Sequence, residues 1–206
     1  LPGLAFQTDV LILDGKECVF TPRFSYKGFQ YVEIRSSRPI KLDETNVTAL
    51  NFHSDLKEVG HFSCSNDLLN QIWKAANRSY LSNVMSIPTD CPQRNERLGW
   101  TADTQVFAET GSFFANTSSF FHKWMRDLID SQGETGGFPG VAPLSQYGND
   151  MTRLGWSDAG VIVPWTIWKQ FGDKEIVELS WDAMEKYMSH INETRYDHNT
   201  LIGENG

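Results

Sequence analysis

The apolar residues of this chain change their spacing near residue 65, and that change constrains the fold more than any other feature of the sequence. Before it, short apolar segments alternate with polar residues, as in residues 29–34 (FQYVEI), which is typical of a half-buried strand. Beyond it, apolar residues recur every three to four positions, which is typical of helices that pack on one face. We therefore expect a mixed, mainly α chain, with β structure in residues 1–64 and helices in residues 65–206.

Four segments of the first part have the composition of strands: residues 10–13, 17–24, 29–34 and, less cleanly, 48–53. The turn signal Asp14-Gly15 separates the first two. Strands at this spacing, divided by Gly, Pro and Ser, are typical of a β-sandwich. We expect residues 1–64 to form the end of such a domain.

The second part predicts five helices. The first has Ser65 or Asn66 as its N-cap and ends before Pro88. A single apolar stripe runs along it, made of Leu68, Leu69, Ile72, Trp73, Ala76 and Tyr80. The second begins near Asp103, and Gly111 together with residues 116–118 marks its end. The third carries the most regular apolar spacing, at Phe120, Phe121, Trp124, Met125, Leu128 and Ile129.

A Gly-rich connection, residues 131–158, precedes the last two helices, and its aromatic residues argue against disorder. The fourth helix spans about residues 159–171, where Pro164 should kink it or mark its first turn. A break at Gly172-Asp173 precedes the fifth, over residues 176–191. Trp73, Trp124 and Trp181 lie on apolar helical faces and are expected in the core, whereas Trp165 and Trp168 are undecided. Helix after helix without strands favours a bundle or an α/α toroid.

Composition limits the possible partners. The net charge is -8, and no Lys/Arg cluster stands out, which excludes nucleic acid and anionic membranes as expected partners. No apolar run approaches the roughly 18 residues of a membrane span. The first residues carry no basic signal-peptide region, and the last residues form no terminating element. We expect a fragment of a longer protein, with its compartment left open between cytoplasm, periplasm and exterior.

Metal-ligating residues are scattered. The three cysteines, Cys18, Cys64 and Cys91, form no CxxC pair, and the five histidines show no ligand spacing. We expect free or buried thiols, no metal site and no cofactor.

The chemistry points to residues 90–103, which read DCPQRNERLGWTAD. Pro88, Pro92 and Gly99 predict an irregular loop between helices, a common place for catalytic residues. Glycoside cleavage needs an acid for the leaving oxygen and a second carboxylate, and aromatic rings suit sugar faces. A surface loop of Arg–carboxylate pairs would use the same residue types, so composition alone does not decide.

This stretch resembles the signature of the bacterial-type α-L-rhamnosidases, Asp-Cys-Pro-Gln-Arg-Asp/Glu-Glu-Arg-x-Gly-Trp-x-Gly/Ala-Asp. Residues 66–70 are similar to the first barrel helix of that family, and residues 155–159 (GWSDA) to its Trp-Gly-Asp-Ala segment, with Ser157 in place of Gly. The resemblance implies an inverting glycoside hydrolase with a six-hairpin α/α barrel. Residues 1–64 would then be the C-terminal part of a β-sandwich, and residues 65–206 the first half of an (α/α)6 barrel.

By this resemblance Glu96 is the general acid, which must hold a proton near neutral pH. Asn95 departs from the acidic residue usual at its position and removes one charge beside Glu96. The remaining matches are sugar ligands and pocket walls: Asp90, Asp103, Arg94, Trp100 and Trp156. Asp158 is equally well a sugar ligand or the N-cap of the fourth helix, whereas Glu134 and Asp150 are expected to be solvated.

No glutamate of this chain matches the family's general base, which we expect outside the fragment, so the 206 residues alone should not hydrolyse rhamnosides. The implied partner is a rhamnose-containing glycoside or polysaccharide. A half-barrel would expose apolar helix faces, so a homo-oligomer is possible. Two alternatives stay open: another inverting α/α-barrel glycosidase with a different sugar, and a carbohydrate-binding relative without catalysis.

Overall fold

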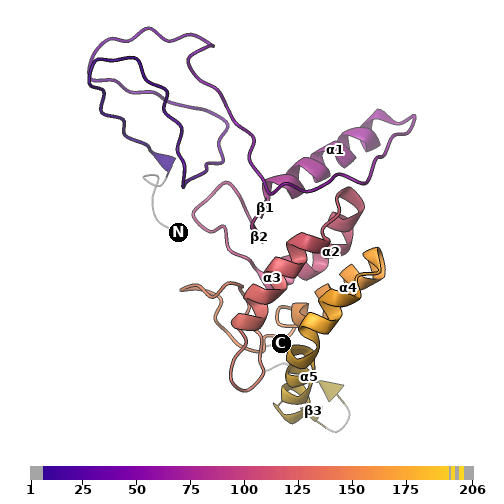
Figure 1. Ribbon diagram of the computed structural model, residues 1–206. Helices are drawn as coiled ribbons and strands as arrows, with labels where there is room; N and C mark the ends of the chain where they lie inside the picture. The colour runs from indigo at the N-terminus through magenta and orange to yellow at the C-terminus, as the bar shows by residue number, and fades with distance from the viewer. Residues whose placement is uncertain (1–6, 195, 198–199, 202–206) are drawn as a thin grey trace. The chain divides into compact units, whose positions relative to one another are not determined.

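The computed structural model describes residues 7–194 and the backbone of residues 196–197 and 200–201. The structure is mainly helical, as expected from the sequence (Figure 1). Its elements in these residues are helices α1 (Asp67–Ser82), α2 (Thr101–Phe114), α3 (Ser118–Asp130), α4 (Ala159–Phe171) and α5 (Lys174–Thr194), with antiparallel pairs β1 (Val84–Met85) with β2 (Ile87–Pro88) and β3 (Tyr196–Asp197) with β4 (Thr200–Leu201).

The described residues divide into two compact units. The first, called here the N-terminal unit, comprises residues 7–52 together with Cys91–Arg97. The second, the helical unit, comprises residues 53–90 and the residues from Leu98 onward. The division places part of the 90–103 loop in each unit, so each is described by itself.

The four predicted strands do not form in residues 7–52, which consist of loops, turns and bends. A strand exists only through a ladder of backbone hydrogen bonds to a neighbour, and the described part of this unit contains no such ladder. Side chains supply contacts instead. The Gln7 amide binds Gly28 in both directions, accepting from its N–H at 3.0 Å and donating to its carbonyl at 2.9 Å, and Lys27 pairs with Asp9 at 3.0 Å.

The predicted start of α1 is confirmed. Asn66 is the N-cap, and its side-chain oxygen accepts a hydrogen bond from the Leu68 N–H at 3.0 Å. The helix ends at Ser82, before Pro88, as expected. Of its apolar stripe, Tyr80 is buried, whereas Leu68, Leu69 and Ile72 are exposed.

Gly111 does not end α2, which continues to Phe114. The reason for a glycine there is tertiary contact, because a Cβ on Gly111 would lie 2.7 Å from the Tyr80 ring of α1. Phe107 and Phe114 of α2 pack against the same ring, with centroids 5.6 and 5.9 Å away. Gly111 therefore marks the place where α2 packs closely against α1, and not the end of α2.

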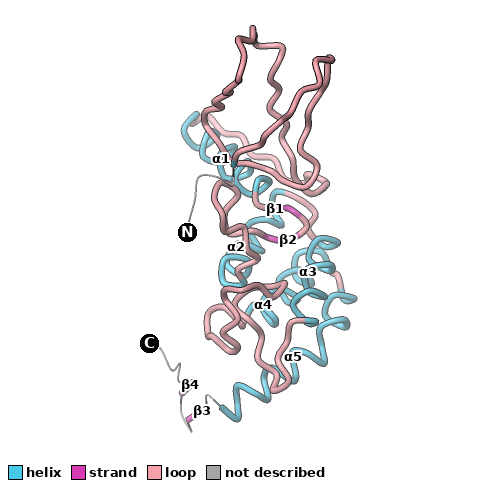
Figure 2. The backbone as a smooth tube through the Cα atoms, turned by 90° about the vertical axis from the view of Figure 1, so that its left-hand side faces the viewer, coloured by secondary structure: helices cyan, strands magenta, loops and turns pink. Residues whose placement is uncertain are grey.

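Helix α3 supplies the centre of the core, as its apolar spacing predicted. Trp124, Met125 and Leu128 are completely buried, and the Trp124 indole N–H donates to the Ala142 carbonyl at 3.1 Å. Helix α4 packs against α2, α3 and α5. Figures 1 and 2 show these helices lying next to one another.

Pro164 lies inside α4 and is buried, which excludes the alternative that it marks the first turn. One expectation for the last helices needs correction. Trp181 of α5 is 53% exposed and is not a core residue, because the buried side of α5 is formed by Ile176, Ala183, Tyr187 and Ile191. The break at Gly172 is confirmed, since this residue ends α4 in the left-handed conformation with φ of 67°.

The Gly-rich connection is ordered and packed, as its aromatic residues predicted. Phe138, Val141 and Ala142 are buried, and Val141 forms an isolated β-bridge with Trp100. The Thr101 N–H donates to the Gly140 carbonyl at 2.9 Å. Figure 2 shows this connection as the long loop between α3 and α4. It thus holds the start of α2, where Trp100 and Asp103 of the predicted site lie.

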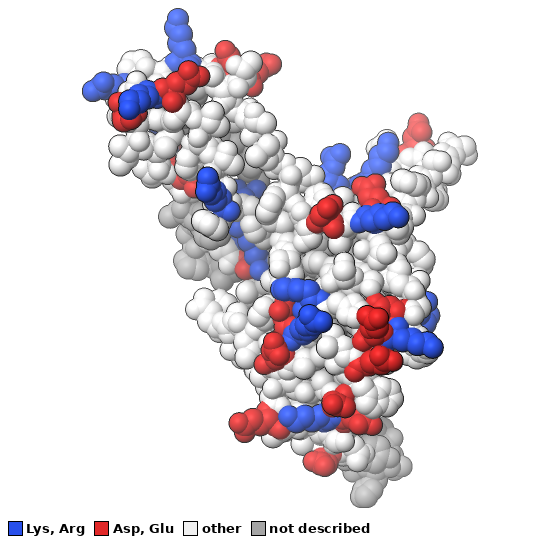
Figure 3. Space-filling model, in the orientation of Figure 1, with Lys and Arg blue, Asp and Glu red and all other residues white. Residues whose placement is uncertain are grey.

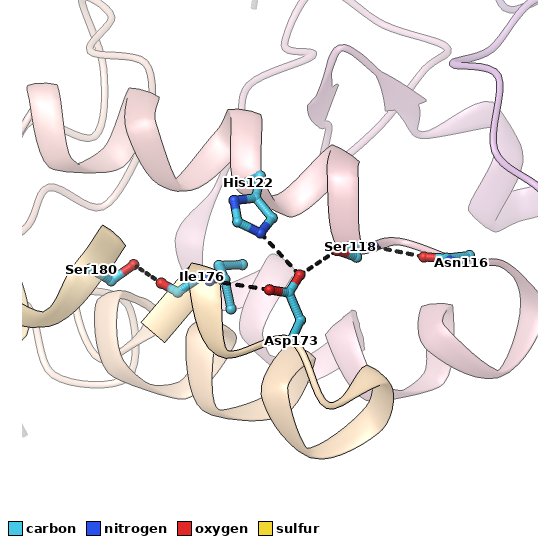
Figure 4. Close-up of polar contacts among 6 residues, drawn as sticks. All are labelled: Asn116, Ser118, His122, Asp173, Ile176 and Ser180. Atoms are coloured by element: carbon cyan, nitrogen blue, oxygen red, sulfur yellow. Dashed lines mark hydrogen bonds and ion pairs between the residues drawn. The ribbon is translucent and has the colours of Figure 1, made fainter. Parts of the chain in front are cut away.

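Asp173 joins α3 to the turn between α4 and α5 (Figure 4). Its carboxylate accepts hydrogen bonds from the Ser118 hydroxyl, from His122 Nε2 at 2.9 Å and from the Ile176 N–H at 3.2 Å. Burial alone would raise the pKa of Asp173, but these hydrogen bonds and the charge of His122 lower it overall.

Acidic and basic side chains lie interspersed on the face of the molecule drawn in Figure 3. Among the described residues, no helix has both the length and the apolar character needed to cross a membrane.

Candidate active site

Asp90 closes the base of the predicted catalytic loop. Its N–H donates to the Leu98 carbonyl at 3.0 Å, and its Oδ1 accepts the Leu98 N–H at 2.9 Å. These two hydrogen bonds join two residues that are eight positions apart, so residues 91–97 leave and return at one point. Asp90 therefore shapes the loop, whether or not it also binds a sugar.

Within that loop, Glu96 pairs with Arg94. Arg94 Nη2 lies 2.7 Å from Glu96 Oε2, and Arg94 Nε donates to Cys91 Sγ at 3.4 Å. The side chain of Glu96 is 19% exposed, and that of Arg94 is 60% exposed. The pairing holds the carboxyl group in one orientation at a partly sheltered position.

Arg97 anchors the loop, a role that its place in the sequence did not indicate. Its Nη1 donates to the Tyr26 carbonyl at 2.7 Å, its Nε donates to the Pro92 carbonyl at 3.1 Å, and its guanidinium lies 4.2 Å from the Tyr26 ring centroid. Its φ of 54° is unusual for a residue other than glycine. A second arginine in the motif was the available signal, but its partner is 71 residues away.

The helical unit brings Trp100 and Trp156 together. A Cβ added to Gly140 would lie 3.6 Å from Trp156 Cδ1 and 3.7 Å from Trp100 Cζ3. Both indoles therefore border Gly140, although they are 56 positions apart in the sequence. Trp100 is the N-cap residue of α2, and Trp156 lies in the turn before α4. Two half-buried indoles around a glycine make an apolar border of the kind that sugar faces contact.

Asp103 lies in the first turn of α2 and is exposed, in a position where its charge favours the helix N-terminus. Glu134 and Asp150 are exposed loop residues, as expected. Cys18 and Cys64 are exposed, Cys91 is buried, and none of the three forms a disulfide.

Asp158 occupies the N-cap position of α4, but its side chain makes no capping hydrogen bond. Its Oδ2 accepts the Gly155 N–H at 2.6 Å, and its Oδ1 accepts the Tyr187 hydroxyl at 2.7 Å. Tyr187 lies on α5, and its polar role was missed because it is 29 positions away from Asp158 in the sequence. Burial, and then the hydrogen bond and charge of Asp158, raise the pKa of Tyr187.

Comparison with known proteins covers nearly the whole chain. Residues 57–205 match the family described as the bacterial α-L-rhamnosidase six-hairpin glycosidase domain, and residues 3–53 match the bacterial α-L-rhamnosidase concanavalin-like domain. An α-L-rhamnosidase of Formosa agariphila is 38% identical over 177 residues, which are 85% of this chain and 19% of that protein.

Two solved structures are similar in fold and sequence. The α-L-rhamnosidase of Aspergillus terreus gives a TM-score of 0.68 at 38% identity, over 72% of this chain and 17% of that one. The Streptomyces avermitilis α-L-rhamnosidase complexed with L-rhamnose gives a TM-score of 0.67 at 34% identity, over 70% and 14%. The chain thus spans less than a fifth of the length of these relatives.

Proposed function

The chain belongs to the bacterial α-L-rhamnosidase six-hairpin glycosidase family, and we propose that the protein containing it releases terminal α-L-rhamnose from rhamnosides or polysaccharides with inversion. The observation that carries the proposal is the 90–98 loop. Its ends are joined by hydrogen bonds between Asp90 and Leu98, and it holds Glu96 beside Arg94. The relatives' names supply the sugar, since each is an α-L-rhamnosidase.

In this proposal Glu96 is the general acid. It gives its proton to the glycosidic oxygen as the bond from that oxygen to the anomeric carbon breaks. A water attacks the opposite face of the anomeric carbon and loses a proton to a general base, which we place outside these 206 residues. Inverting enzymes hold the two carboxyl groups about 6.5–9.5 Å apart to leave room for this water.

The sugar would be held by the polar and aromatic residues that match the family's motifs. Asp90 and Asp103 accept hydrogen bonds from rhamnose hydroxyls, and Arg94 lies beside the sugar. The border that Trp100 and Trp156 form around Gly140 receives the ring face and the C6 methyl group, because apolar C–H surface stacks well on indoles.

We also propose the domain assignment that the sequence suggested. Residues 1–64 are the C-terminal part of a β-sandwich and residues 65–206 the N-terminal part of an (α/α)6 barrel. The concanavalin-like match over residues 3–53 and the glycosidase match over residues 57–205 support this assignment. A homo-oligomer remains a prediction.

The test is Glu96→Gln in the full protein that contains this sequence. Because an alkoxide leaving group needs protonation and a nitrophenolate needs it far less, turnover of an alkyl α-L-rhamnoside should fall about 10²–10⁴-fold. Turnover of p-nitrophenyl α-L-rhamnoside should fall much less. The matched control is Glu134→Gln, which changes an exposed loop glutamate and should leave both rates unchanged.

Equal, small losses on both substrates would remove Glu96 from the acid role. Turnover of a different α-glycoside in place of the rhamnoside would favour the related-glycosidase alternative. Sugar binding without any turnover would favour a non-catalytic relative. NMR identification of the rhamnose anomer that forms first then tests whether hydrolysis proceeds with inversion.

A further inference from the structure

The turn that carries Trp156 is fastened through Asp158, a candidate sugar ligand by sequence, and through Tyr187, which the sequence did not associate with the site. We propose that Asp158 and Tyr187 are positioning residues that clamp this turn and thereby hold the Trp156 indole for the sugar, an inference that rests on the function proposed above. In this role Asp158 acts on the turn and not on the substrate.

In this clamp, each carboxylate oxygen of Asp158 accepts a hydrogen bond from a different donor. Gly155 donates its N–H to Oδ2 at 2.6 Å, and Tyr187 donates its hydroxyl to Oδ1 at 2.7 Å. Gly155 has φ of 82°, a conformation that side-chain-bearing residues rarely adopt, so the turn depends on this glycine. Asp158 thus ties the turn before α4 to the body of α5.

Tyr187 is a rigid support for this contact. The residue is 2% exposed, and its ring lies against the fully buried ring of Phe138, with centroids 5.3 Å apart. Because burial and the carboxylate charge raise its pKa, the hydroxyl keeps its proton and remains a donor throughout the physiological range.

Three further contacts involve residues of this turn. Gln105 of α2 donates to the Gly155 carbonyl at 2.5 Å. The completely buried Ser157 donates its hydroxyl to the Phe138 carbonyl at 2.6 Å. The Arg153 guanidinium lies 3.9 Å from the centroid of the Trp156 ring. Arg153 covers one face of the indole, so a sugar would stack on the other.

A fixed indole binds a sugar more tightly than a mobile one, because no side-chain entropy is lost in ordering it when the sugar binds. The contact with the sugar face exists in both the ground state and the transition state. Loosening the turn should therefore raise KM more than it lowers kcat.

The first experiment needs no sugar. The full protein is labelled with 5-fluorotryptophan, and the Trp156 resonance is identified in the ¹⁹F spectrum by its loss in Trp156→Phe. Tyr187→Phe keeps the ring and removes only the hydroxyl. The Trp156 resonance should broaden or split in this variant, and Asp158→Asn should produce the same change.

Tyr80→Phe is the matched control, because Tyr80 is also buried but its hydroxyl has no hydrogen-bond partner among the described residues. Its spectrum should retain the wild-type Trp156 resonance. An unchanged Trp156 resonance in both Tyr187→Phe and Asp158→Asn would overturn the inference.

The second experiment links the clamp to function. Tyr187→Phe should raise KM for an α-L-rhamnoside about tenfold with kcat falling less than about threefold. In a Trp156→Phe background the same change should cost less than about twofold, since the two residues act through one contact. An equal cost in both backgrounds would mean a merely structural role and would overturn the inference. If the wild type turns over no rhamnoside but the ¹⁹F change occurs, the proposed function fails and the clamp stands.

Discussion

Apolar side chains of the N-terminal unit are exposed to solvent, whereas those at the centre of the helical unit are buried. In residues 7–52, Ile12 and Val19 are 91% and 94% exposed. In α3, Trp124, Met125 and Leu128 are fully buried. Both parts are rich in apolar side chains, so hydrophobicity alone does not explain the contrast.

The difference lies in where backbone hydrogen bonds come from. A helix satisfies its N–H and C=O groups within one segment, so α1 to α5 form and then pack through their apolar faces. A strand needs a neighbouring strand for every hydrogen bond, and the described residues 7–52 form no ladder. Apolar side chains without that framework have no common face on which to pack.

The largest expected contrast comes from removing one aromatic side chain in each unit. Trp124→Ala should reduce the free energy of unfolding by about 3–5 kcal/mol, because it leaves a cavity at the centre of the core. Phe24→Ala should change it by less than about 0.5 kcal/mol, since Phe24 is fully exposed. Urea denaturation followed by circular dichroism at 222 nm measures both, and similar losses would break the comparison.

A smaller contrast is expected from adding a methyl group at a tightly packed glycine. A Cβ on Gly160 would lie 2.1 Å from the Phe138 ring, so Gly160→Ala should cost about 1–3 kcal/mol of unfolding free energy. A Cβ on Gly28 would lie 2.4 Å from Gln93 Cα in the predicted catalytic loop. Gly28→Ala should therefore lower rhamnoside turnover of the full protein, about tenfold, through displacement of that loop.

Gly133→Ala is the control for both glycine variants, because its Cβ would make only ordinary contacts, the nearest at 3.5 Å. It should change neither stability nor turnover appreciably. If Gly28→Ala left turnover at the control value, the contact of Gly28 with Gln93 would have no part in shaping the loop.

The smallest effect concerns two aspartates whose pKa values are lowered, one in each unit. Asp173 is lowered by the hydrogen bonds shown in Figure 4, against the effect of its burial, whereas Asp43 is lowered by the Thr45 side chain and backbone N–H. Asp173→Asn should cost about 1 kcal/mol at pH 7. Asp43→Asn, on an exposed turn, should leave the unfolding midpoint unchanged.

The pH dependence gives the sign of the Asp173 effect. A lowered folded-state pKa contributes stability that is present above the unfolded value of about 3.9 and is lost as pH falls through the folded value. The gap between wild type and Asp173→Asn should therefore narrow as pH is reduced from 6 toward 2 in urea titrations. A gap that widens on acidification would contradict the assignment.

Helix positions were predictable because their information is local. The Asn66 cap, the buried face of α3 and the break at Gly172 all follow from short-range spacing and capping chemistry. Gly111 was misread because a glycine that ends a helix and a glycine that admits a neighbouring ring have the same sequence signal. Trp181 was misread because periodicity identifies an apolar face without saying what covers it.

In the candidate site, too, residues that are close in sequence were predicted, and contacts between distant residues were not. The 90–103 loop was found because its motif is contiguous, and its resemblance to the α-L-rhamnosidases agrees with the family match. The groups that hold the site come from distant positions: Tyr26 supports Arg97, and Tyr187 supports Asp158. No short-range pattern relates residues that are 71 or 29 positions apart.

The sequence by itself determined which segments are helices, where the chemically active loop lies and which family the loop resembles, because each depends on neighbouring residues. Only the tertiary structure decided that Asp158 faces Tyr187 and Gly155, and that Trp100 and Trp156 share the border of Gly140. Hydrogen bonds and close contacts depend on distances of a few ångströms, which arise only when separate helices and loops pack together.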